Sequence, residues 1–414
     1  MSTPKNTHKN KNKNIIMTVL VAALGYFVDI YDLILFSVVR TSSLRSLGVP
    51  QAELMNEGLF LLNMQMTGML IGGVLWGVLG DKRGRVSVLF GSIFLYSAAN
   101  IANAYVDTVF WYGIWRFIAG IGLAGELGAA ITLVSEIMSK ESRGYGTTIV
   151  ASVGICGAIV AAQIGNRFSW TTAYIVGGVL GFLLLGLRIG IYDSGMYQSL
   201  QGSKTKRGNF LMLFSSWSRF KKYLNCILIG VPIWFVIGVL VSFSPELSLA
   251  MGIEGVSAGY AVMYCYIGLA LGDLASGLLS QLFKNRKKVI FVFISMTLAF
   301  VFYYIFMGTV TLSHFYWVCG LLGFAIGYWA IFVTVASEQF GTNIRATVTT
   351  TVPNFVRGSV VLITSAFKSL ASTYGFSVLN SALVIGLVCV AIAYIALLNL
   401  KETFAKDLDY TEVE

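Results

Sequence analysis

The feature that most constrains this chain is a series of long apolar stretches that recur along its whole length. Each stretch has about 20 residues or more, the length that an α-helix needs to cross about 30 Å of hydrocarbon. The twelve predicted spans are 15–39, 55–79, 86–105, 109–138, 146–165, 171–191, 222–244, 257–281, 289–310, 314–337, 348–370 and 376–400. Because helices satisfy their own backbone polar groups inside lipid, the pattern predicts an all-α polytopic membrane protein.

The composition leaves little material for anything besides these helices. The 414 residues are 56% hydrophobic and only 12% charged, whereas soluble domains carry about 25% charged residues. The five cysteines fall in separate apolar segments without a C-x-x-C or a histidine at ligand spacing, so neither a disulfide framework nor a metal site is predicted. No phosphate-binding glycine loop leads into a helix. We therefore expect no enzyme, no ATP-driven pump and no cofactor, with the lipid bilayer as the surrounding solvent.

The basic residues orient the predicted helices in the membrane. Most of the 29 Lys and Arg lie near the two ends of the chain and in the loops 81–85, 139–143, 188–222, 282–288 and 339–345. Loops rich in Lys and Arg stay in the cytoplasm. Both termini are therefore expected to be cytoplasmic, with the chain crossing the cell inner membrane many times. This placement explains the net charge of +10 without a nucleic-acid partner.

An internal repeat divides the chain into two related halves. At a constant offset of 202 residues, Ser135-Glu136, Arg143 and Thr147-Thr148 recur as Ser337-Glu338, Arg345 and Thr349-Thr350. Parallel repeats of six spans place a small-molecule solute between them near the membrane centre and allow alternating access by rocking. The predicted divisions are a disordered tail at 1–14, six-helix bundles at 15–192 and 221–400, a cytoplasmic linker at 193–220 and a second tail at 401–414. A monomer is expected.

The turn after the second predicted span carries a family signature. Gly80-Asp81-Lys82-Arg83-Gly84-Arg85 closely resembles the loop between the second and third helices of the major facilitator superfamily. The resemblance implies two pseudo-symmetric six-helix bundles and a gate on the cytoplasmic face. The gate residues that it implies are Asp81, Arg85, Glu136 and Arg143 in the first half and Glu338 and Arg345 in the second. The loop at 281–288 lacks the acid and both glycines, so an equivalent latch is not predicted there.

Two further segments narrow the branch of the family. The first-span segment Gly25-Tyr-Phe-Val-Asp29-Ile-Tyr-Asp-Leu33 is similar to the first helix of the phosphate:proton and related metabolite:proton symporters. Where the phosphate transporters read Gly-Asp-Tyr-Pro, this chain reads Gly125-Glu-Leu-Gly128, which looks more like transporters of organic acids or other metabolites. The family's antiporters carry a Gly-Pro pattern in the fifth helix, and 151–165 contains no proline. The resemblance therefore favours import, with an antiporter that exports a drug, siderophore or other small molecule as the alternative.

Ionisable residues inside the predicted spans are candidates for proton coupling. Charged groups at this depth are costly, so they are functional candidates when a partner can be named. The four candidates are Asp29, Asp32, Arg116 and Glu126. At a rise of about 1.5 Å per residue, Asp32 and Arg116 lie at similar depth and can form a gated ion pair, while Asp29 or Glu126 carries the proton. A static network that fixes the first span against the fourth is the alternative, and sodium stays open as the coupling ion.

Solute binding is predicted mainly in the second half. Arg357 lies near the middle of the span at 348–370, and its planar fork suits a carboxylate or phosphate, while Asn354 one turn earlier can add a hydrogen bond. The aromatic residues deep enough to line a cavity are Tyr31, Trp234, Tyr264, Tyr328 and Trp329. The alternative for Arg357 is a structural pairing with Asp273 or another acid at the interface of the two halves. The sequence thus predicts a proton-coupled symporter that imports a small polar, anionic or zwitterionic metabolite.

Overall fold

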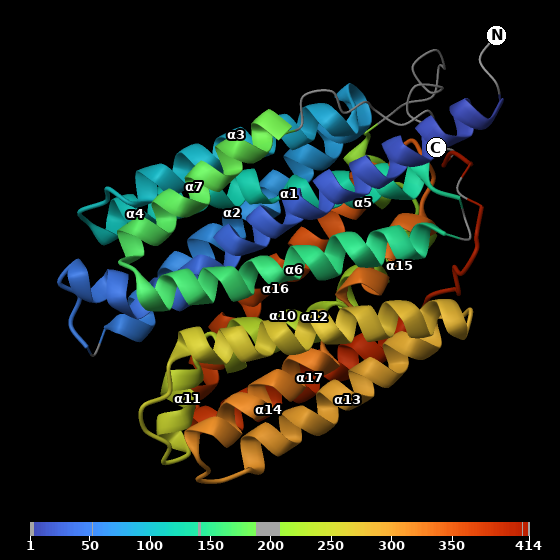
Figure 1. The fold of residues 1–414 in the computed structure, drawn as a ribbon. Coiled ribbons are helices and arrows are strands. Elements are labelled where there is room, and N and C mark those ends of the chain that lie inside the picture. Colours follow the sequence, from blue (N-terminus) through green and yellow to red (C-terminus); the bar gives the residue numbers. More distant parts are fainter. Residues whose placement is uncertain (1–3, 52, 140–141, 188–207, 408, 413–414) are drawn as a thin grey trace.

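The structure is a computed structural model that describes residues 4–51, 53–139, 142–187, 208–407 and 409–412. Over these residues the chain forms helices joined by turns, with no β-strand. The long helices run side by side along one axis, and the start of the first helix and the segment after the last helix lie at the same end of the molecule (Figure 1). We call this the terminal end and the opposite one the distal end.

The helices form two bundles that follow one another in the chain (Figure 1). The first bundle contains α1 (Pro4–Ser46), α2 (Leu54–Arg83), α3 (Arg85–Asn103), α4 (Val109–Leu123), α5 (Glu126–Ile137), α6 (Arg143–Arg167) and α7 (Trp170–Leu187). The second contains η1 (Phe210–Phe214), α9 (Trp217–Leu228), α10 (Val231–Phe235), η2 (Val236–Val241), α11 (Ser244–Ala250), α12 (Ala258–Leu282), α13 (Arg286–Phe306), α14 (Leu312–Ala325), α15 (Trp329–Gln339), α16 (Arg345–Ser372) and α17 (Val378–Asn399).

Length and hydropathy identify most of these helices as membrane spans. In the described part of the chain, 11 helical segments are long and apolar enough to cross a membrane, with α4–α5, α14–α15 and the stretch from α9 to η2 each taken as one segment. The remaining long helix is α16, which has 28 residues but carries a run of threonines together with Asn354 and Arg357. These polar residues are buried inside the protein, so α16 can cross the bilayer without exposing them to lipid.

Two predicted spans are interrupted at equivalent positions, where the sequence predicted continuous helices. The span at 109–138 breaks between α4 and α5 at Gly125, and the span at 314–337 breaks between α14 and α15 at Gly327. The two glycines are separated by the same 202 residues as the rest of the repeat. Each break leaves the N-terminal turn of a half-helix, α5 or α15, in the interior of the molecule.

A third predicted span, 222–244, is also not one continuous α-helix. Proline has no N–H to donate and clashes with the preceding turn, and Pro232 stands in the first turn of α10, just after α9 ends at Leu228. The segment continues as the π-helix η2, a form that is rare and usually marks a local adjustment of the backbone. Ile233, Trp234 and Ile237, which follow Pro232 on this irregular segment, line the cavity described below.

Two other expectations about the connecting segments differ from the structure or fall outside it. The structure continues α1 through residues 4–14, which the sequence predicted as a disordered tail. Proline is favoured in the first turn of a helix, and no glycine or second proline follows Pro4 before Gly25. The predicted linker at 193–220 lies outside the described residues as far as 207, and its described part contains the short helix η1.

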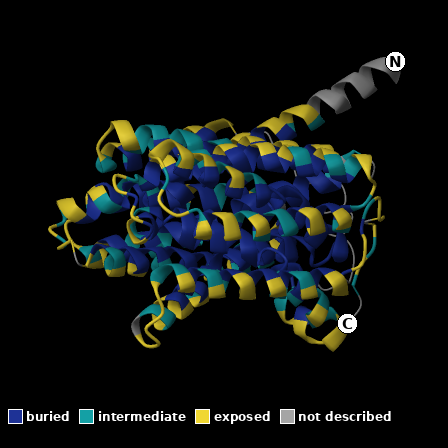
Figure 2. Cartoon of the chain, turned by 90° about the horizontal axis from the view of Figure 1, so that it is seen from below, coloured by how far each residue is buried: buried dark blue, intermediate teal, exposed yellow. Residues whose placement is uncertain are grey.

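The two bundles meet mainly where α2 packs against α16 and α6 packs against α12. Close approach depends on small residues, since a Cβ atom at Gly128 would collide with Thr350, and one at Gly277 would collide with Thr148. Burial follows the same arrangement: buried residues gather in the interior of the molecule, and exposed ones lie along its edges and ends (Figure 2).

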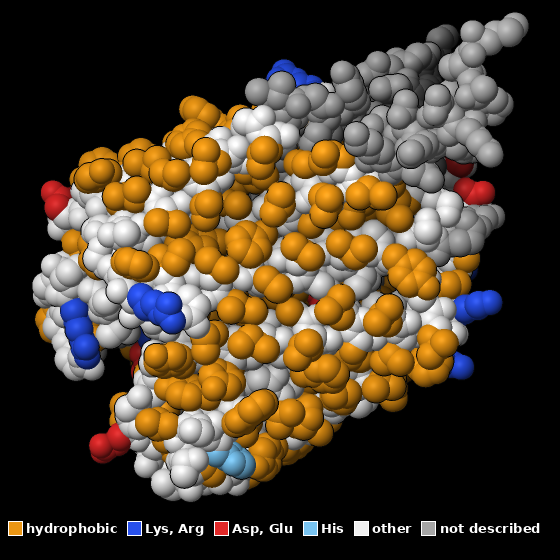
Figure 3. All heavy atoms as spheres, viewed as in Figure 1, with side chains coloured by type: hydrophobic (Ala, Val, Ile, Leu, Met, Phe, Trp, Pro, Cys, Tyr) orange, Lys and Arg blue, Asp and Glu red, His pale blue; other side chains and the backbone are white. Residues whose placement is uncertain are grey.

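The outer surface of the helices is apolar, as contact with lipid requires. On the face drawn in Figure 3, hydrophobic side chains cover the length of the helices, and charged side chains lie toward the two ends. Large exposed apolar side chains such as Phe94, Leu183, Leu278 and Leu387 belong to helices on the outside of the bundles. An apolar belt between two polar rims is the arrangement expected of a protein that spans a bilayer.

Candidate functional site

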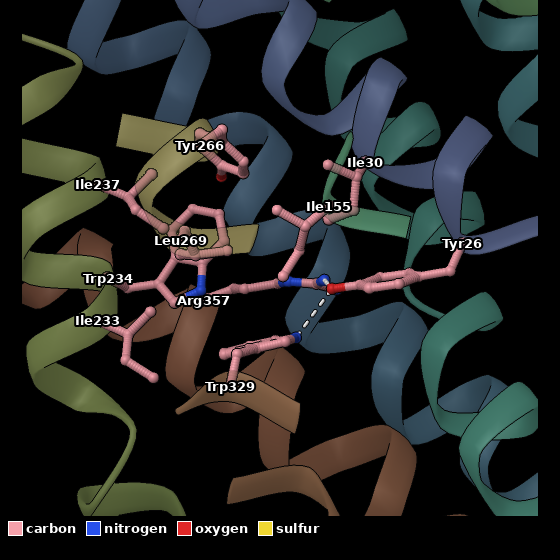
Figure 4. A pocket seen from close by; sticks show the side chains of 10 residues that line it. All are labelled: Tyr26, Ile30, Ile155, Ile233, Trp234, Ile237, Tyr266, Leu269, Trp329 and Arg357. Atoms are coloured by element: carbon pink, nitrogen blue, oxygen red, sulfur yellow. Dashed lines mark hydrogen bonds between the residues drawn. The ribbon is translucent and has the colours of Figure 1, made fainter. Parts of the chain in front are cut away.

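A small cavity lies between the two bundles at the centre of the molecule (Figure 4). Its volume is about 20 Å³, which is room for a single water molecule. The residues that line it are Tyr26, Ile30, Ile155, Ile233, Trp234, Ile237, Tyr266, Leu269, Trp329 and Arg357. They come from both bundles, because α1 and α6 supply three of the side chains and the second bundle supplies the others.

Arg357 is the charged residue of this cavity. It is 1% exposed, and its guanidinium carbon lies 5.3 Å from the ring centre of Trp329 and 5.9 Å from that of Trp234. Its Nη1 donates to Asn354 Oδ1 at 3.2 Å, and its Nη2 donates to the Tyr26 hydroxyl at 3.5 Å. Aromatic faces attract a cation but do not neutralise it.

No carboxylate of the described residues pairs with Arg357, and its Nε has no hydrogen-bond partner among them. The alternative partner considered from the sequence, Asp273, is engaged elsewhere: its Oδ1 accepts from the backbone N–H of Ala330 at 3.0 Å, in the first turn of α15. A buried, uncompensated guanidinium is unfavourable. The cavity therefore presents unsatisfied positive charge and donors that suit an anionic group.

Tyr26 joins the two bundles at this point. Its hydroxyl accepts from Trp329 Nε1 at 2.8 Å as well as from Arg357, and Figure 4 shows all three side chains converging from opposite sides of the cavity. The ring also fills the space beside Gly154 of α6, where a Cβ atom would collide with it. One tyrosine of the first bundle thus contacts the principal charged and aromatic residues of the second.

The aromatic residues predicted for the cavity divide into two groups. Trp234 and Trp329 line it. The Tyr31 hydroxyl donates instead to the carbonyl of Ala173 at 2.9 Å, on the α7 side of its helix. Tyr328 donates to the carbonyl of Ile229 at 3.0 Å, inside the second bundle.

Tyr264 is also placed elsewhere, since its ring stacks on Tyr316 of α14 at 5.7 Å between ring centres. The two tyrosines that do line the cavity, Tyr26 and Tyr266, were not singled out from the sequence. Tyr26 lies five residues before Tyr31, and Tyr266 lies two residues after Tyr264, so each points to a different face of its helix from the residue that was chosen. The spacing of Tyr26 and Ile30, four residues apart, was the available signal for a shared face.

The four residues predicted for proton coupling are all fully buried. Asp32 interacts electrostatically with Asp29 and Arg116 and packs against Gly177 of α7. Arg116 does not form the predicted ion pair with Asp32: it donates to Gln65 Oε1 and, at 3.4 Å, to the Tyr174 hydroxyl. In this state the Arg116 guanidinium is bonded to neutral acceptors. No ion pair between Asp32 and Arg116 therefore links α1 to α4.

The acids of α1 adjoin the central cavity through Tyr26. Asp29 lies three residues after Tyr26 and interacts electrostatically with it, as do Arg357 and Asp273. Glu126 occupies the first turn of α5, directly after the break at Gly125, where the helix dipole favours a negative charge. Asp29, Tyr26, Asp273 and Arg357 therefore form one connected region that spans both bundles.

Contacts between the bundles close the terminal end. The Asp81 carboxylate accepts from the backbone N–H groups of Ala346 and Thr347, at 3.1 and 2.8 Å, and from the Thr347 hydroxyl at 2.6 Å. It thereby caps α16 from the other bundle. Glu136 and Arg345 also bridge the bundles at 3.4 Å. The side chains of two other predicted gate residues, Arg85 and Arg143, lie outside the described residues.

The second half has its own ion pair at this end, although no equivalent latch was predicted there. Glu338 binds Arg286 with two contacts, at 2.7 and 2.8 Å. Arg286 comes from the loop that lacks the acid and the glycines of the family signature, and it reaches Glu338 from the first turn of α13. Since the pair lies within the second bundle, it stiffens that bundle and does not bridge the two.

The distal end is arranged differently. Arg40 of α1 pairs with Glu246 of α11 at 2.8 Å, and its guanidinium carbon lies 4.5 Å from the ring centre of Phe243. Outside this pair lies a vestibule of about 480 Å³, lined by residues of both bundles that include Glu246, Arg45 and Asn166. The Arg40–Glu246 pair was not predicted, because the two residues are 206 positions apart. Since Glu246 lines the vestibule, the Arg40–Glu246 pair joins the two bundles at the vestibule wall.

Comparisons with known proteins agree with this architecture. The sequence model of the Major Facilitator Superfamily matches residues 22–363. The "Putative niacin/nicotinamide transporter NiaP" of Bacillus subtilis (strain 168) is 26% identical over 388 residues, which cover 90% of this chain and 94% of that protein. The "Niacin transporter NiaP" of Acinetobacter baylyi (strain ATCC 33305 / BD413 / ADP1) is 25% identical over 360 residues, which cover 79% and 80%.

A solved structure gives the same result for the fold. The proton:xylose symporter XylE bound to 6-bromo-6-deoxy-D-glucose matches with a TM-score of 0.76 at 16% identity, over 96% of this chain and 98% of that chain. The likeness confirms the predicted fold of twelve helices in two six-helix bundles. Together with the match of the family model over most of the sequence, it establishes that the chain belongs to the major facilitator superfamily.

Proposed function

We propose that this transporter is a proton-coupled symporter of the cell inner membrane that imports a small metabolite carrying a carboxylate. The observation that carries the proposal is the buried guanidinium of Arg357, which has two tryptophan faces around it and no carboxylate partner among the described residues. A carboxylate can accept two parallel hydrogen bonds from such a fork. The tryptophan and tyrosine rings beside it favour a solute with a flat, partly apolar body.

Niacin is the first solute to test. Two relatives that align with most of the chain are named for niacin transport, and niacin is an aromatic ring that carries one carboxylate. Arg357 would hold the carboxylate, and Trp234 and Trp329 would enclose the ring. The cavity must widen to admit it, since about 20 Å³ is too small for any such solute in the present conformation.

Proton coupling is supported by the buried acids of the first bundle. Asp29 interacts electrostatically with Tyr26, whose hydroxyl is bonded to Trp329 and Arg357. A proton on Asp29 would therefore change the electrostatic field at the place where the solute anion binds. We infer that the solute and the proton favour each other's binding, which is the requirement of symport.

The two ends of the molecule fit one step of alternating access. The terminal end, which the basic loops assign to the cytoplasm, is closed by Asp81 and by the Glu136–Arg345 pair. A vestibule opens at the distal end and stops at the Arg40–Glu246 pair. We infer that a solute from outside reaches this vestibule and that separation of the pair admits it to the cavity.

Uptake into proteoliposomes tests the proposal. Labelled nicotinate is expected to accumulate when the outside is more acidic than the inside, and to equilibrate without accumulation when the proton gradient is collapsed. A sodium gradient at constant pH should give no accumulation. Accumulation driven by sodium alone would mean that sodium and not the proton is the coupling ion. Efflux driven by an inward proton gradient would favour the alternative, an antiporter that exports its solute.

Arg357 variants identify the site in the same assay. Arg357→Lys keeps the charge but loses the planar fork, so the affinity for nicotinate should fall about tenfold or more, given about 1.5–3 kcal/mol for each hydrogen bond to a charged group. Lys368→Gln, on the same helix but exposed near its distal end, is the matched control and should bind as the parent does. If the Arg357→Lys variant bound every carboxylate in a panel with unchanged affinity, the proposal that Arg357 binds the solute anion would be wrong.

A further inference from the structure

A second pocket lies at the terminal end, away from the central cavity. It has a volume of about 470 Å³ and lies between the start of α9, the end of α17 and the segment that follows α17. The charged residues that line it are Arg219, Lys221, Lys222, Lys401, Lys406 and Glu412. Five cations thus face one carboxylate, and none of them takes part in the transport site described above.

Neutral groups complete the lining of this basic pocket. Ser216 and Ser218, at the start of α9, and Asn399, at the end of α17, place hydroxyl and amide groups beside the cations. Phosphate oxygens accept hydrogen bonds from lysine, arginine and hydroxyl donors alike. The chemistry of the lining therefore suits a phosphate group better than a single carboxylate, because a phosphate offers more acceptor oxygens.

The pocket also lies where lipid meets water. Trp217, which begins α9, is 74% exposed, and Leu398, which precedes the lining residue Asn399, is 77% exposed. Phe214 of η1 is exposed beside them. Exposed aromatic residues at the ends of membrane helices sit at the level of the lipid headgroups, so the mouth of the pocket is at headgroup depth.

The local electrostatics favour an added anion. Burial and the neighbouring charge of Lys222 lower the pKa of Lys406 below its usual range, although Glu412 and Glu338 act in the opposite direction. Among the residues that line the pocket, five cations face one carboxylate, so the lining carries net positive charge. An anion that enters would be attracted by every cation of the lining.

We propose that this basic pocket binds the phosphate of an anionic phospholipid headgroup from the cytoplasmic leaflet. Basic pockets between membrane helices on the cytoplasmic side are suited to such headgroups. Arg219 and Lys222 are the principal contacts, since both already hold the Glu412 carboxylate, at 3.6 and 3.2 Å. The headgroup phosphate takes the place of that carboxylate.

Displacement of Glu412 has a consequence for the gate. The backbone around Glu412 is bonded to the loop between α15 and α16: Glu412 N donates to Asn343 Oδ1 at 2.9 Å, and Thr342 N donates to the Tyr410 carbonyl at 2.8 Å. This loop leads directly into Arg345, which bridges the bundles. A bound headgroup therefore loosens the hold of the C-terminal segment on the loop that enters the cytoplasmic gate.

Native mass spectrometry of the full-length protein in detergent tests the pocket without any transport assay. The probes are dihexanoyl phosphatidylglycerol, dihexanoyl phosphatidylcholine, glycerol 1-phosphate and inorganic phosphate. Phosphatidylglycerol should bind in preference to the other three. Arg219→Gln combined with Lys222→Gln should lower the affinity for phosphatidylglycerol about tenfold or more, because each basic residue near a charged membrane surface contributes about 1 kcal/mol. Lys284→Gln combined with Lys288→Gln, at the same end but outside the pocket, is the matched control.

The Glu412→Gln variant separates a binding role from a structural one. Removal of the competing carboxylate should tighten phosphatidylglycerol binding about two- to fivefold, as expected for an ion pair near the protein surface, whereas a purely structural role for these residues gives no tighter binding. If glycerol 1-phosphate bound as tightly as phosphatidylglycerol, the ligand of the pocket would be a soluble phosphate ester and not a lipid. Unchanged phosphatidylglycerol binding in the Arg219 and Lys222 variant would overturn the site itself.

Discussion

The roles that we assign to Arg357 and Asp29 depend on the residues that surround them. Arg357 faces tryptophan rings and neutral donors or acceptors, whereas Asp29 lies next to the tyrosine that touches Arg357. An anion at Arg357 and a proton at Asp29 would each reduce the unbalanced charge in this region. Burial makes both effects larger than they would be in water.

A substitution at Asp29 tests this coupling. Asp29→Asn keeps the size of the side chain and cannot release a proton, so proton-driven accumulation of nicotinate should be lost while counterflow exchange across proteoliposomes continues. Retained exchange is expected because the substituted amide is neutral, like the protonated acid. If accumulation and exchange were lost together, Asp29 would be a structural part of α1, and Glu126→Gln should then be measured in the same two assays.

At the scale of helices, the breaks in α4–α5 and α14–α15 decide where side chains meet. Each break ends one helix and starts another in the interior, and each new N-terminus needs acceptors for its N–H groups. Asp273 of α12 serves the start of α15, at Ala330 N. In the other half, Asn354 Nδ2 donates to the carbonyl of Ala124 at 2.7 Å, at the end of α4. The breaks are thus held by polar side chains that adjoin the cavity.

Removal of the cap on α15 should loosen the wall of the cavity. Asp273→Ala leaves the first N–H groups of α15 without their acceptor, which should lower the free energy of unfolding by about 1 kcal/mol and reduce solute affinity, because Trp329 is the first residue of that helix. Asp273→Asn can still accept the hydrogen bond and is the control. Thermal unfolding in detergent measures the first effect, and an equal loss in both variants would assign the role to the charge rather than to the cap.

The packing of α5 against α16 gives a second test at this scale. A methyl group at Gly128 would collide with Thr350, so Gly128→Ala should push the bundles apart at the terminal end and reduce transport. The second change Thr350→Ala removes Oγ1, the nearest atom that the new methyl group would meet. The double variant of Gly128→Ala with Thr350→Ala should therefore regain part of the activity. Uptake by the single and double variants is compared, and a double variant worse than Gly128→Ala would contradict the contact.

The whole molecule differs between its two ends. In the described part of the chain, the bundles are joined on the terminal side by the three Asp81 bonds to α16, the Glu136–Arg345 pair and threonine contacts of Thr349 and Thr334. On the distal side they are joined by the Arg40–Glu246 pair and by the contacts Ser37–Ser242, Asn63–Thr364 and Gln163–Met263. Fewer polar contacts are therefore broken when the distal end opens. This asymmetry favours opening toward the vestibule first.

Weakening the terminal-end contacts should shift the balance toward opening on that side. With Ile233→Cys as a reporter in the cavity of a variant without native cysteines, Arg345→Ala should increase labelling by a membrane-impermeant thiol reagent applied to the terminal end. Arg40→Ala should increase labelling from the distal end instead, and serves as the opposite control. Labelling that does not change from either end would mean that these pairs do not gate access.

The sequence by itself determined most of the membrane spans, the division into two halves and the family, and its basic loops predict the orientation of the helices. Those properties follow from hydropathy, loop charge and short motifs, which are local or repeat at a fixed offset. Arg357, Trp234, Trp329 and the gate residue Asp81 could also be chosen from the sequence, because a polar or aromatic residue deep in a span, or a strong motif, is visible without a partner.

Only the tertiary structure decided which way the side chains face. Tyr26 rather than Tyr31, and Tyr266 rather than Tyr264, line the cavity, since a shift of a few residues turns a side chain to a different neighbour. The pairs Arg40–Glu246 and Arg286–Glu338 likewise join distant parts of the chain. Facing and pairing depend on how helices pack against one another, and a span that is apolar on most sides carries little signal of its own orientation.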